Sequence, residues 1–111
     1  MKSLIWIGRS REELRAFSPE ARHKAGDELR RVQYGETPSD WRPTTDVGVG
    51  VCVIRIHGAV EHRVLYISKF PEGVYVLHAF VKRNRRTPRL NLDVARRRVR
   101  ALARLRAGKE Q

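Results

Sequence analysis

The chain has 111 residues and a mass of 12.9 kDa, which is enough for one small domain and leaves no room for a second core. Its 24 Lys and Arg residues outnumber the 12 Asp and Glu residues, so the formal net charge is +12 at pH 7. This charge argues against a purely hydrophobic partner and favours a polyanion. Hydrophobic residues make up 41% of the chain, which excludes a disordered basic tail and predicts a packed core.

The basic residues are concentrated at one end of the chain. Residues 1–81 contain 12 basic and 10 acidic side chains, whereas residues 82–111 contain 12 basic and 2 acidic ones. An ordinary solvated helix would carry more Glu for pairing at a spacing of four residues, and this segment has Asp93 alone before Glu110. The last quarter of the chain is therefore expected to form a directed positive surface.

The single cysteine and the N-terminus exclude several further classes. Cys52 cannot form an internal disulfide, and with four scattered histidines it does not build a metal cluster. We therefore expect no metal ion and no cofactor. The apolar stretch at residues 4–7 is far shorter than a signal sequence or a membrane span, so we expect a cytoplasmic protein with no membrane association.

A strand and a short helix are predicted at the start of the chain. Residues 2–7 are rich in β-branched and aromatic side chains and end at Gly8, as a short strand does. Ser10 with Glu13 three residues later has the spacing of a capping box, so a helix of about two turns is expected to begin at Ser10.

A second helix is predicted immediately afterwards. Ser18 is a good N-cap, Pro19 suits the first helical position, and Gly35 suits the end. Apolar residues recur between them at helical spacing, at Ala21, Ala25, Leu29 and Val32. Residues 35–48 contain two prolines and no periodicity, which predicts a surface loop.

Three strands and a terminal helix complete the prediction. Residues 49–56, 63–70 and 74–81 are separated by short turn-rich segments, which indicates an antiparallel meander. A basic helix is expected to begin at residue 88 or 91 and to end at residue 107, with a narrow apolar stripe at Leu92, Val99 and Leu102. The predicted order is β, α, α, β, β, β, α, in the α+β class.

Four basic residues occupy strand ends rather than loops. Arg55 ends one predicted strand and Arg63 begins the next, so the two are expected to be neighbours. Lys82 and Arg83 close the third strand, beside the start of the second, so all four could converge. Such a cluster is a natural phosphate receptor, since Arg binds two oxygens at once. The alternative is a row of surface residues whose charged ends reach into solvent.

If the anion is RNA, its 2′-hydroxyl is a built-in nucleophile and cleavage needs no metal. Cations must stabilise the charge that develops on the phosphate, and Arg63, Lys82 and Arg83 suit that role. Proton transfer remains unassigned among four candidates: His57, His62, His78 and Tyr66. His78 lies mid-strand between apolar neighbours, which favours a core histidine over a general base.

Three segments resemble the phage-derived branch of the RelE/HigB-like toxins of bacterial toxin–antitoxin pairs. They are VIRIHG at residues 53–58, RVLY at residues 63–66 and VYVLHAFVKRNRRTP at residues 74–88, followed by the Arg-rich helix. The resemblance implies a RelE-like fold, in which an antiparallel sheet packs on two N-terminal helices. It also implies cleavage of mRNA in the ribosomal A site, and neutralisation by an antitoxin with a helix-turn-helix domain in a toxin–antitoxin hetero-oligomer.

The resemblance also assigns roles to residues. The family's strand arginine falls on Arg63 and its basic pair falls on Lys82 and Arg83, which become the expected catalytic residues. RNA-backbone contacts are expected from Arg55, Arg85, Arg86 and Arg89. The chain departs from its ribosome-dependent relatives at Val51 and Val53, where they often carry lysines, and it lacks the His or Tyr that some carry near the C-terminus.

A non-catalytic function is the alternative. The same fold is used by ParE-like toxins that poison DNA gyrase, and a basic domain could also bind ribosomal RNA without cleaving anything. Convergence of Arg63, Lys82 and Arg83 in one site favours cleavage, whereas a basic helix without a converging pocket favours binding.

Overall fold

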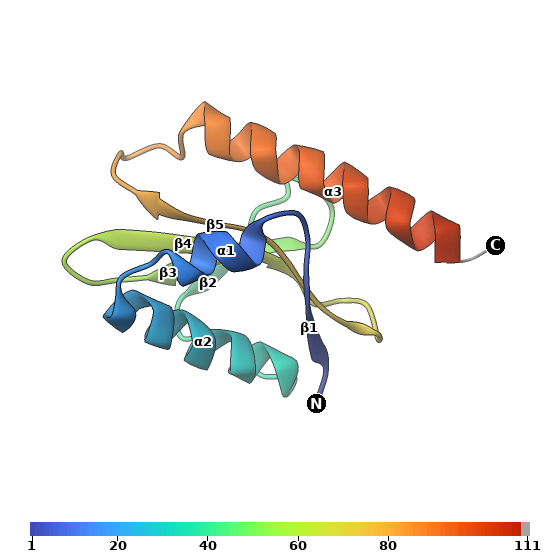
Figure 1. The fold of residues 1–111 in the computed structure, drawn as a ribbon, viewed down its shortest axis with the longest axis horizontal. Helices are drawn as coiled ribbons and strands as arrows, with labels where there is room; N and C mark the ends of the chain where they lie inside the picture. Colours follow the sequence, from blue (N-terminus) through green and yellow to red (C-terminus); the bar gives the residue numbers. More distant parts are fainter. Residues whose placement is uncertain (110–111) are drawn as a thin grey trace.

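A five-stranded mixed sheet forms the centre of the structure, a computed structural model that describes residues 1–109. The strand order is β1-β5-β4-β3-β2, with β1 (Ser3–Trp6), β2 (Trp41–Pro43), β3 (Val51–Ile56), β4 (Glu61–Ile67) and β5 (Gly73–Lys82). The helices are α1 (Ser10–Arg15), α2 (Pro19–Gln33) and α3 (Arg89–Lys109). Figure 1 shows α3 along one side of the sheet and α2 along the other. The predicted α+β class is confirmed.

Two features of the predicted topology are wrong. The order is β, α, α, β, β, β, β, α, because β2 lies inside the segment expected to be a loop and pairs with β3, Trp41 opposite Ile54. A three-residue edge strand that contains a proline has too little periodicity to be recognised. The sheet is also not wholly antiparallel, since β1 runs parallel to β5, with Ser3 opposite Gly73. The chain between β1 and β5 contains α1, α2 and three strands, so it is long enough to allow this parallel arrangement.

The second helix forms as predicted and the first begins differently. The Ser18 side chain accepts a hydrogen bond from the Ala21 amide, and Pro19 occupies the first turn. In α1, however, Arg9 is the N-cap and makes no side-chain cap. The Ser10 hydroxyl is buried and has no hydrogen-bond partner among residues 1–109. The predicted capping box is therefore wrong, because the Glu13 carboxylate contacts His78 and Arg98 instead.

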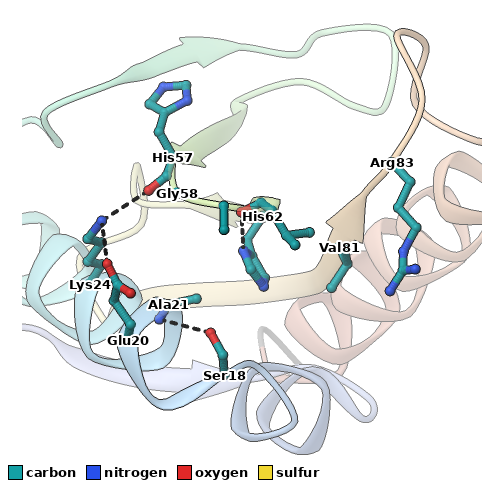
Figure 2. A pocket seen from close by; sticks show the side chains of 11 residues that line it. Ser18, Glu20, Ala21, Lys24, His57, Gly58, His62, Val81 and Arg83 are labelled. Atoms are coloured by element: carbon teal, nitrogen blue, oxygen red, sulfur yellow. Dashed lines mark hydrogen bonds and ion pairs between the residues drawn. The ribbon is translucent and has the colours of Figure 1, made fainter.

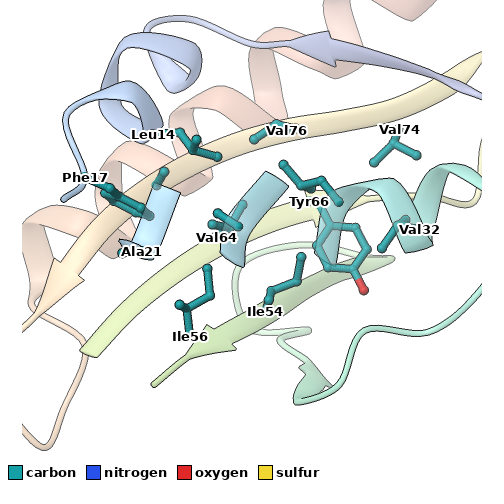
Figure 3. Packing of buried hydrophobic residues seen from close by; sticks show 13 residues of the cluster. Leu14, Phe17, Ala21, Val32, Ile54, Ile56, Val64, Tyr66, Val74 and Val76 are labelled. Carbon is teal, nitrogen blue, oxygen red and sulfur yellow. The ribbon is translucent and has the colours of Figure 1, made fainter. Parts of the chain in front are cut away.

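Apolar side chains fill both faces of the sheet. On one face, α1 and α2 pack against β3, β4 and β5, and Figure 3 shows Leu14 and Phe17 beside Val64 and Val76 in this cluster. On the other face, a second cluster contains α3 residues together with strand residues, among them Ala95, Leu102, Leu65 and Leu77. Because both faces of the sheet are covered, the strands carry apolar residues at odd and even positions alike.

One polar network joins the three layers. Glu13 of α1 accepts two hydrogen bonds from Arg98 of α3, at 2.7 and 2.8 Å. Its Oε1 also lies 2.8 Å from Nδ1 of His78 on β5, whose Nε2 lies 2.7 Å from Asn91 of α3. Gly8, at φ +58, lies against the Arg98 side chain, since a Cβ on Gly8 would be 2.8 Å from Nε of Arg98. The network therefore anchors α3 to the sheet and to α1.

The folded protein is expected to become less stable in acid, because Glu13 becomes protonated there. Although burial acts to raise the pKa of Glu13, hydrogen bonds from His78 and Arg98 lower it from 4.5 to about 2. A carboxyl whose folded-state pKa is depressed stabilises the fold above its unfolded pKa, and the stabilisation is lost as pH falls toward the folded value. At about 1.36 kcal/mol per pKa unit, the contribution at neutral pH is about 3 kcal/mol.

Chemical denaturation of the wild type and Glu13→Gln over a pH series measures this contribution. We expect the Gln variant to be less stable near neutral pH and the gap to narrow as pH falls from 4.5 toward about 2. Equal stability at neutral pH would show that the Glu13 charge contributes nothing.

Candidate anion-binding site

A cavity of about 350 Å³ lies on the face of the sheet that α3 partly covers. Five cationic side chains line it, and we call it the cation cavity: Arg42, Arg55, Arg63, Lys82 and Arg85. Among the described residues of its lining, Asp46 is the one acidic side chain. Apolar side chains from three strands complete it, at Val53, Leu65 and Phe80. An excess of positive charge over a low-dielectric floor attracts anions.

The strand register places the arginines together. Arg55 of β3 pairs with Arg63 of β4, and Arg63 pairs with Phe80 of β5. Arg42 of β2 pairs with Val53, two residues from Arg55 on the same face of β3. Cross-strand partners project their side chains from the same face of a sheet, so these residues form one continuous surface. The expectation that Arg55 and Arg63 are neighbours is confirmed.

Two carboxylates outside the cavity lining hold these arginines. Nε of Arg55 lies 3.1 Å from Oδ1 of Asp40. Nη1 of Arg63 lies 3.3 Å from Oε1 of Glu61 and donates to the His62 carbonyl oxygen at 2.9 Å. The Arg63 side chain is only 11% exposed, so its charge acts through less water than a surface charge does.

Lys82 joins the arginines because β5 contains a bulge. The register between β4 and β5 shifts between Leu65 and Tyr66, so that both Leu77 and His78 lie on the α3 face. From there the alternation continues to Phe80 and Lys82. The Lys82 ammonium donates a hydrogen bond to the backbone carbonyl of Arg85, which folds the following loop over the same cavity. The convergence of Lys82 with Arg55 and Arg63 is confirmed.

Arg83 does not join the cluster. As the next residue after Lys82, it points to the opposite face and lines a separate cavity of about 410 Å³ between α2 and the turn that follows β3. Figure 2 shows Arg83 there with Val81 and His62. Its grouping with Arg63 and Lys82, expected from the sequence, is therefore wrong, because consecutive strand residues alternate between faces.

Of the other residues expected to contact RNA, one lines the cation cavity and two lie outside its described lining. Arg85 lines it, whereas Arg86 is exposed in the loop between β5 and α3. Arg89 opens α3 with a side chain that is 92% exposed and lies 3.8 Å from Asp93. Their role in RNA binding stays a prediction.

The described lining of the cation cavity includes none of the four candidate proton-transfer side chains. His78 is buried and both of its ring nitrogens are engaged in the network that joins the layers, which confirms its interpretation as a core histidine. His62 packs against the Phe17 ring on the opposite face. Tyr66 belongs to the core beneath α2, where burial raises the pKa of its hydroxyl. The ring of His57 is held by carboxylates.

The sequence did not reveal two charged residues of the described cavity lining, Arg42 and Asp46. Both lie in the segment that was expected to be a loop, where no periodic pattern marks a side chain's direction. Thr44 donates a hydrogen bond to Oδ1 of Asp46 at 3.1 Å, and Arg96 of α3 donates to the Asp46 carbonyl at 3.3 Å. The pairing of Glu61 with Arg63 was detectable, since residues two apart in a strand share a face.

Metal clusters and membrane spans are both absent from the described part of the chain. Within residues 1–109, no group of three or more His, Cys, Asp or Glu side chains is placed to hold a metal ion. In the same residues, no helix combines the length and the apolar character needed to cross a membrane.

Comparison with known proteins places the chain in a family. No curated protein matches it. The family model described as "Phage derived protein Gp49-like (DUF891)" matches residues 12–100, which is well over half of the chain. The matched segment runs from α1 into α3 and contains every residue that lines the cation cavity. The chain therefore belongs to the phage-derived Gp49-like family.

Proposed function

We propose that this protein is the toxin of a type II toxin–antitoxin pair, a RelE/HigB-like endoribonuclease that cleaves mRNA on the ribosome without a metal ion. Membership of the Gp49-like family, whose members are RelE-like toxins, supports the toxin assignment. The observation that carries the enzymatic proposal is the convergence of Arg55, Arg63 and Lys82 in one cavity, whose described lining holds a single carboxylate, Asp46.

The proposed reaction uses the RNA's own 2′-hydroxyl as nucleophile. Its oxygen attacks phosphorus and the bond from phosphorus to the 5′-oxygen breaks, which yields a cyclic phosphate and a free 5′-hydroxyl. Negative charge accumulates on the non-bridging oxygens in the transition state, and preorganised cations stabilise it without reorganisation. Arg63 suits this role best, because its guanidinium is nearly buried and held by Glu61.

Proton transfer is assigned to the groups that line the cavity. Asp46 supplies the carboxylate of the described lining, so it would take the proton of the 2′-hydroxyl. The Lys82 ammonium would donate a proton to the departing 5′-oxygen. Arg83 has no place in this chemistry, since it lies on the other face of the sheet.

The remaining basic side chains would follow the RNA backbone. Arg55 and Arg85 line the cavity, and Arg86 and Arg89 extend the positive surface toward α3. Contacts of this kind position an RNA without reading its sequence. In the cytoplasm, the proposed partner is a helix-turn-helix antitoxin that forms a hetero-oligomer with the toxin and covers the basic face.

Purified protein added to translating ribosomes tests the proposal. We expect mRNA to be cut at positions related to the codon in the A site, and the cut ends to be mapped by primer extension. Addition of a chelator should leave the cleavage unchanged. Intact mRNA together with inhibited DNA gyrase would instead support the alternative.

That alternative is a non-catalytic module of the same fold, either a gyrase poison or a binder of ribosomal RNA. One observation favours it: no His or Tyr belongs to the described lining of the cation cavity, so acid–base chemistry rests on Asp46 and Lys82. Asp46→Asn separates the two functions. A nuclease should lose cleavage in this variant, whereas a binding module should keep its inhibition.

A further inference from the structure

Five side chains of alternating charge form a chain beside the cation cavity, in the order Arg55, Asp40, His57, Glu61 and Arg63. Nε of Arg55 lies 3.1 Å from Oδ1 of Asp40, whose Oδ2 contacts Nε2 of His57. Nδ1 of His57 lies 2.7 Å from Oε1 of Glu61, and the same oxygen contacts Nη1 of Arg63. The two arginines at the ends line the cation cavity, whereas the three central residues lie outside its described lining.

The position of His57 requires a charged ring. Each ring nitrogen faces a carboxylate oxygen, and an ionised carboxylate only accepts hydrogen bonds, so both nitrogens must carry a proton. The hydrogen bond with Asp40, and then the one with Glu61, raise the pKa of His57 above its ordinary value. The hydrogen bond from His57 lowers the pKa of Asp40. For Glu61, hydrogen bonds from His57 and Arg63 outweigh the effect of burial and lower its pKa.

We propose that His57 is a positioning residue of the cation cavity, whose charged ring occupies Asp40 and Glu61 and so leaves Arg55 and Arg63 able to bind a phosphodiester. When His57 loses its proton, the five-residue chain changes from three cations and two anions to two of each. At least one carboxylate then also loses its donor and competes with the ligand for its arginine. The inference rests on the proposed function, because it takes the cation cavity as the place where the RNA backbone binds.

Most of the other charged groups near His57 have partners of their own. Those that share a cavity with it come from α2, from β4 and from the end of β5: Glu20, Lys24, Asp27, Glu28, His62 and Arg83. Lys24 donates to the His57 backbone carbonyl and pairs with Glu20, and Figure 2 shows the His57 ring pointing away from both. Asp27 pairs with His23, and Glu28 accepts from Ser39. Asp40 and Glu61 are therefore the groups that govern the protonation of the ring.

The expected effect is moderate, because the His57 side chain is 57% exposed. Exposed ion pairs change equilibria by about twofold to fivefold. The affinity of the cavity for a phosphodiester should therefore decrease by about twofold to fivefold as pH rises through the elevated pKa of His57.

A 2′-O-methyl RNA of about ten nucleotides is a suitable probe, since the methyl group blocks the nucleophile and the phosphodiester charge stays constant. Its dissociation constant would be measured by fluorescence anisotropy from about pH 6 to about pH 8.5, with circular dichroism at each pH to confirm folding. We expect the wild type to bind more weakly at high pH and His57→Gln to bind at a constant level near the wild-type value at high pH. His57→Lys keeps its charge, so its affinity should be constant at the level of the protonated wild type.

His23→Gln is the matched control. His23 pairs with Asp27 on α2 and is 80% exposed, so this variant should follow the pH profile of the wild type. The inference would be overturned if the affinity of the wild type did not change with pH, or if the affinity of His57→Gln changed with pH as that of the wild type does. Either result would leave the proposed function intact. If Arg63→Ala binds the probe as tightly as the wild type at every pH, the cavity is not the RNA site, and the proposed function fails together with the inference.

Discussion

Replacing Arg63 by alanine is expected to slow mRNA cleavage by about a hundredfold to a thousandfold, which is the usual loss when one preorganised transition-state donor is removed. Arg63 is the least exposed of the cavity arginines that pair with a carboxylate, and the register of β3, β4 and β5 fixes its position. Single-turnover cleavage on stalled ribosomes measures the chemical step directly. Lys82→Ala should give a loss of similar size if its ammonium protonates the leaving oxygen.

Two further variants make the Arg63 result specific. Arg63→Lys keeps the charge and loses the two-pronged contact, so it should fall between the wild type and the alanine variant. Arg30→Ala removes an exposed positive charge from α2, on the opposite layer, and should cleave at the wild-type rate. Circular dichroism and denaturant unfolding establish that each variant is folded. Wild-type cleavage by a folded Arg63→Ala protein would rule out a catalytic role for the cation cavity.

Binding of RNA or ribosomes is expected to weaken by about a thousandfold between about 50 and about 200 mM monovalent salt, if about six phosphates are contacted. The physical reason is the release of counterions from the RNA as Lys and Arg side chains neutralise its phosphates. The cavity supplies five cationic side chains, and exposed arginines follow it in the loop and at the start of α3. Equilibrium binding at a series of salt concentrations gives the slope of log affinity against log salt.

A pair of double variants locates the phosphate-binding surface. Removing the charges of Arg85 and Arg86 with glutamine should reduce the slope by about 0.7 for each phosphate of a single strand that is no longer neutralised. Arg30 and Arg31 are also adjacent and exposed, but they lie at the end of α2 on the other layer. The same substitution at these two positions changes the net charge equally and should leave the slope unchanged. Equal slopes in both double variants would show that net charge, and not this surface, governs binding.

Much of the fold was accessible from local patterns. The Ser18 cap, Pro19 and the apolar positions of α2 specify a helix through interactions within a few residues of one another. The short turn between β3 and β4 forces their ends together, which is why the proximity of Arg55 and Arg63 was predictable. The accumulation of positive charge after residue 81 is a property of the sequence itself.

The composition of the site depended on contacts between distant segments. A single bulge in β5 decides that Lys82, and not Arg83, faces the cavity, and no turn residue or change of pattern marks it. Arg42 lines the cavity because it belongs to the edge strand β2, which forms by pairing with β3. Asp40, which precedes β2, and Glu61, which begins β4, both contact the ring of His57, which follows β3.

Periodicity, caps and charge runs act over a few residues, so the sequence by itself determined the helices, most strands and the positive end of the chain. Which side of the sheet each cation faces is set by register, and a shift of one residue reverses it. Register depends on how the whole sheet packs between α2 and α3. For that reason only the tertiary structure decided which basic residues meet, which one is excluded, and which carboxylates hold them.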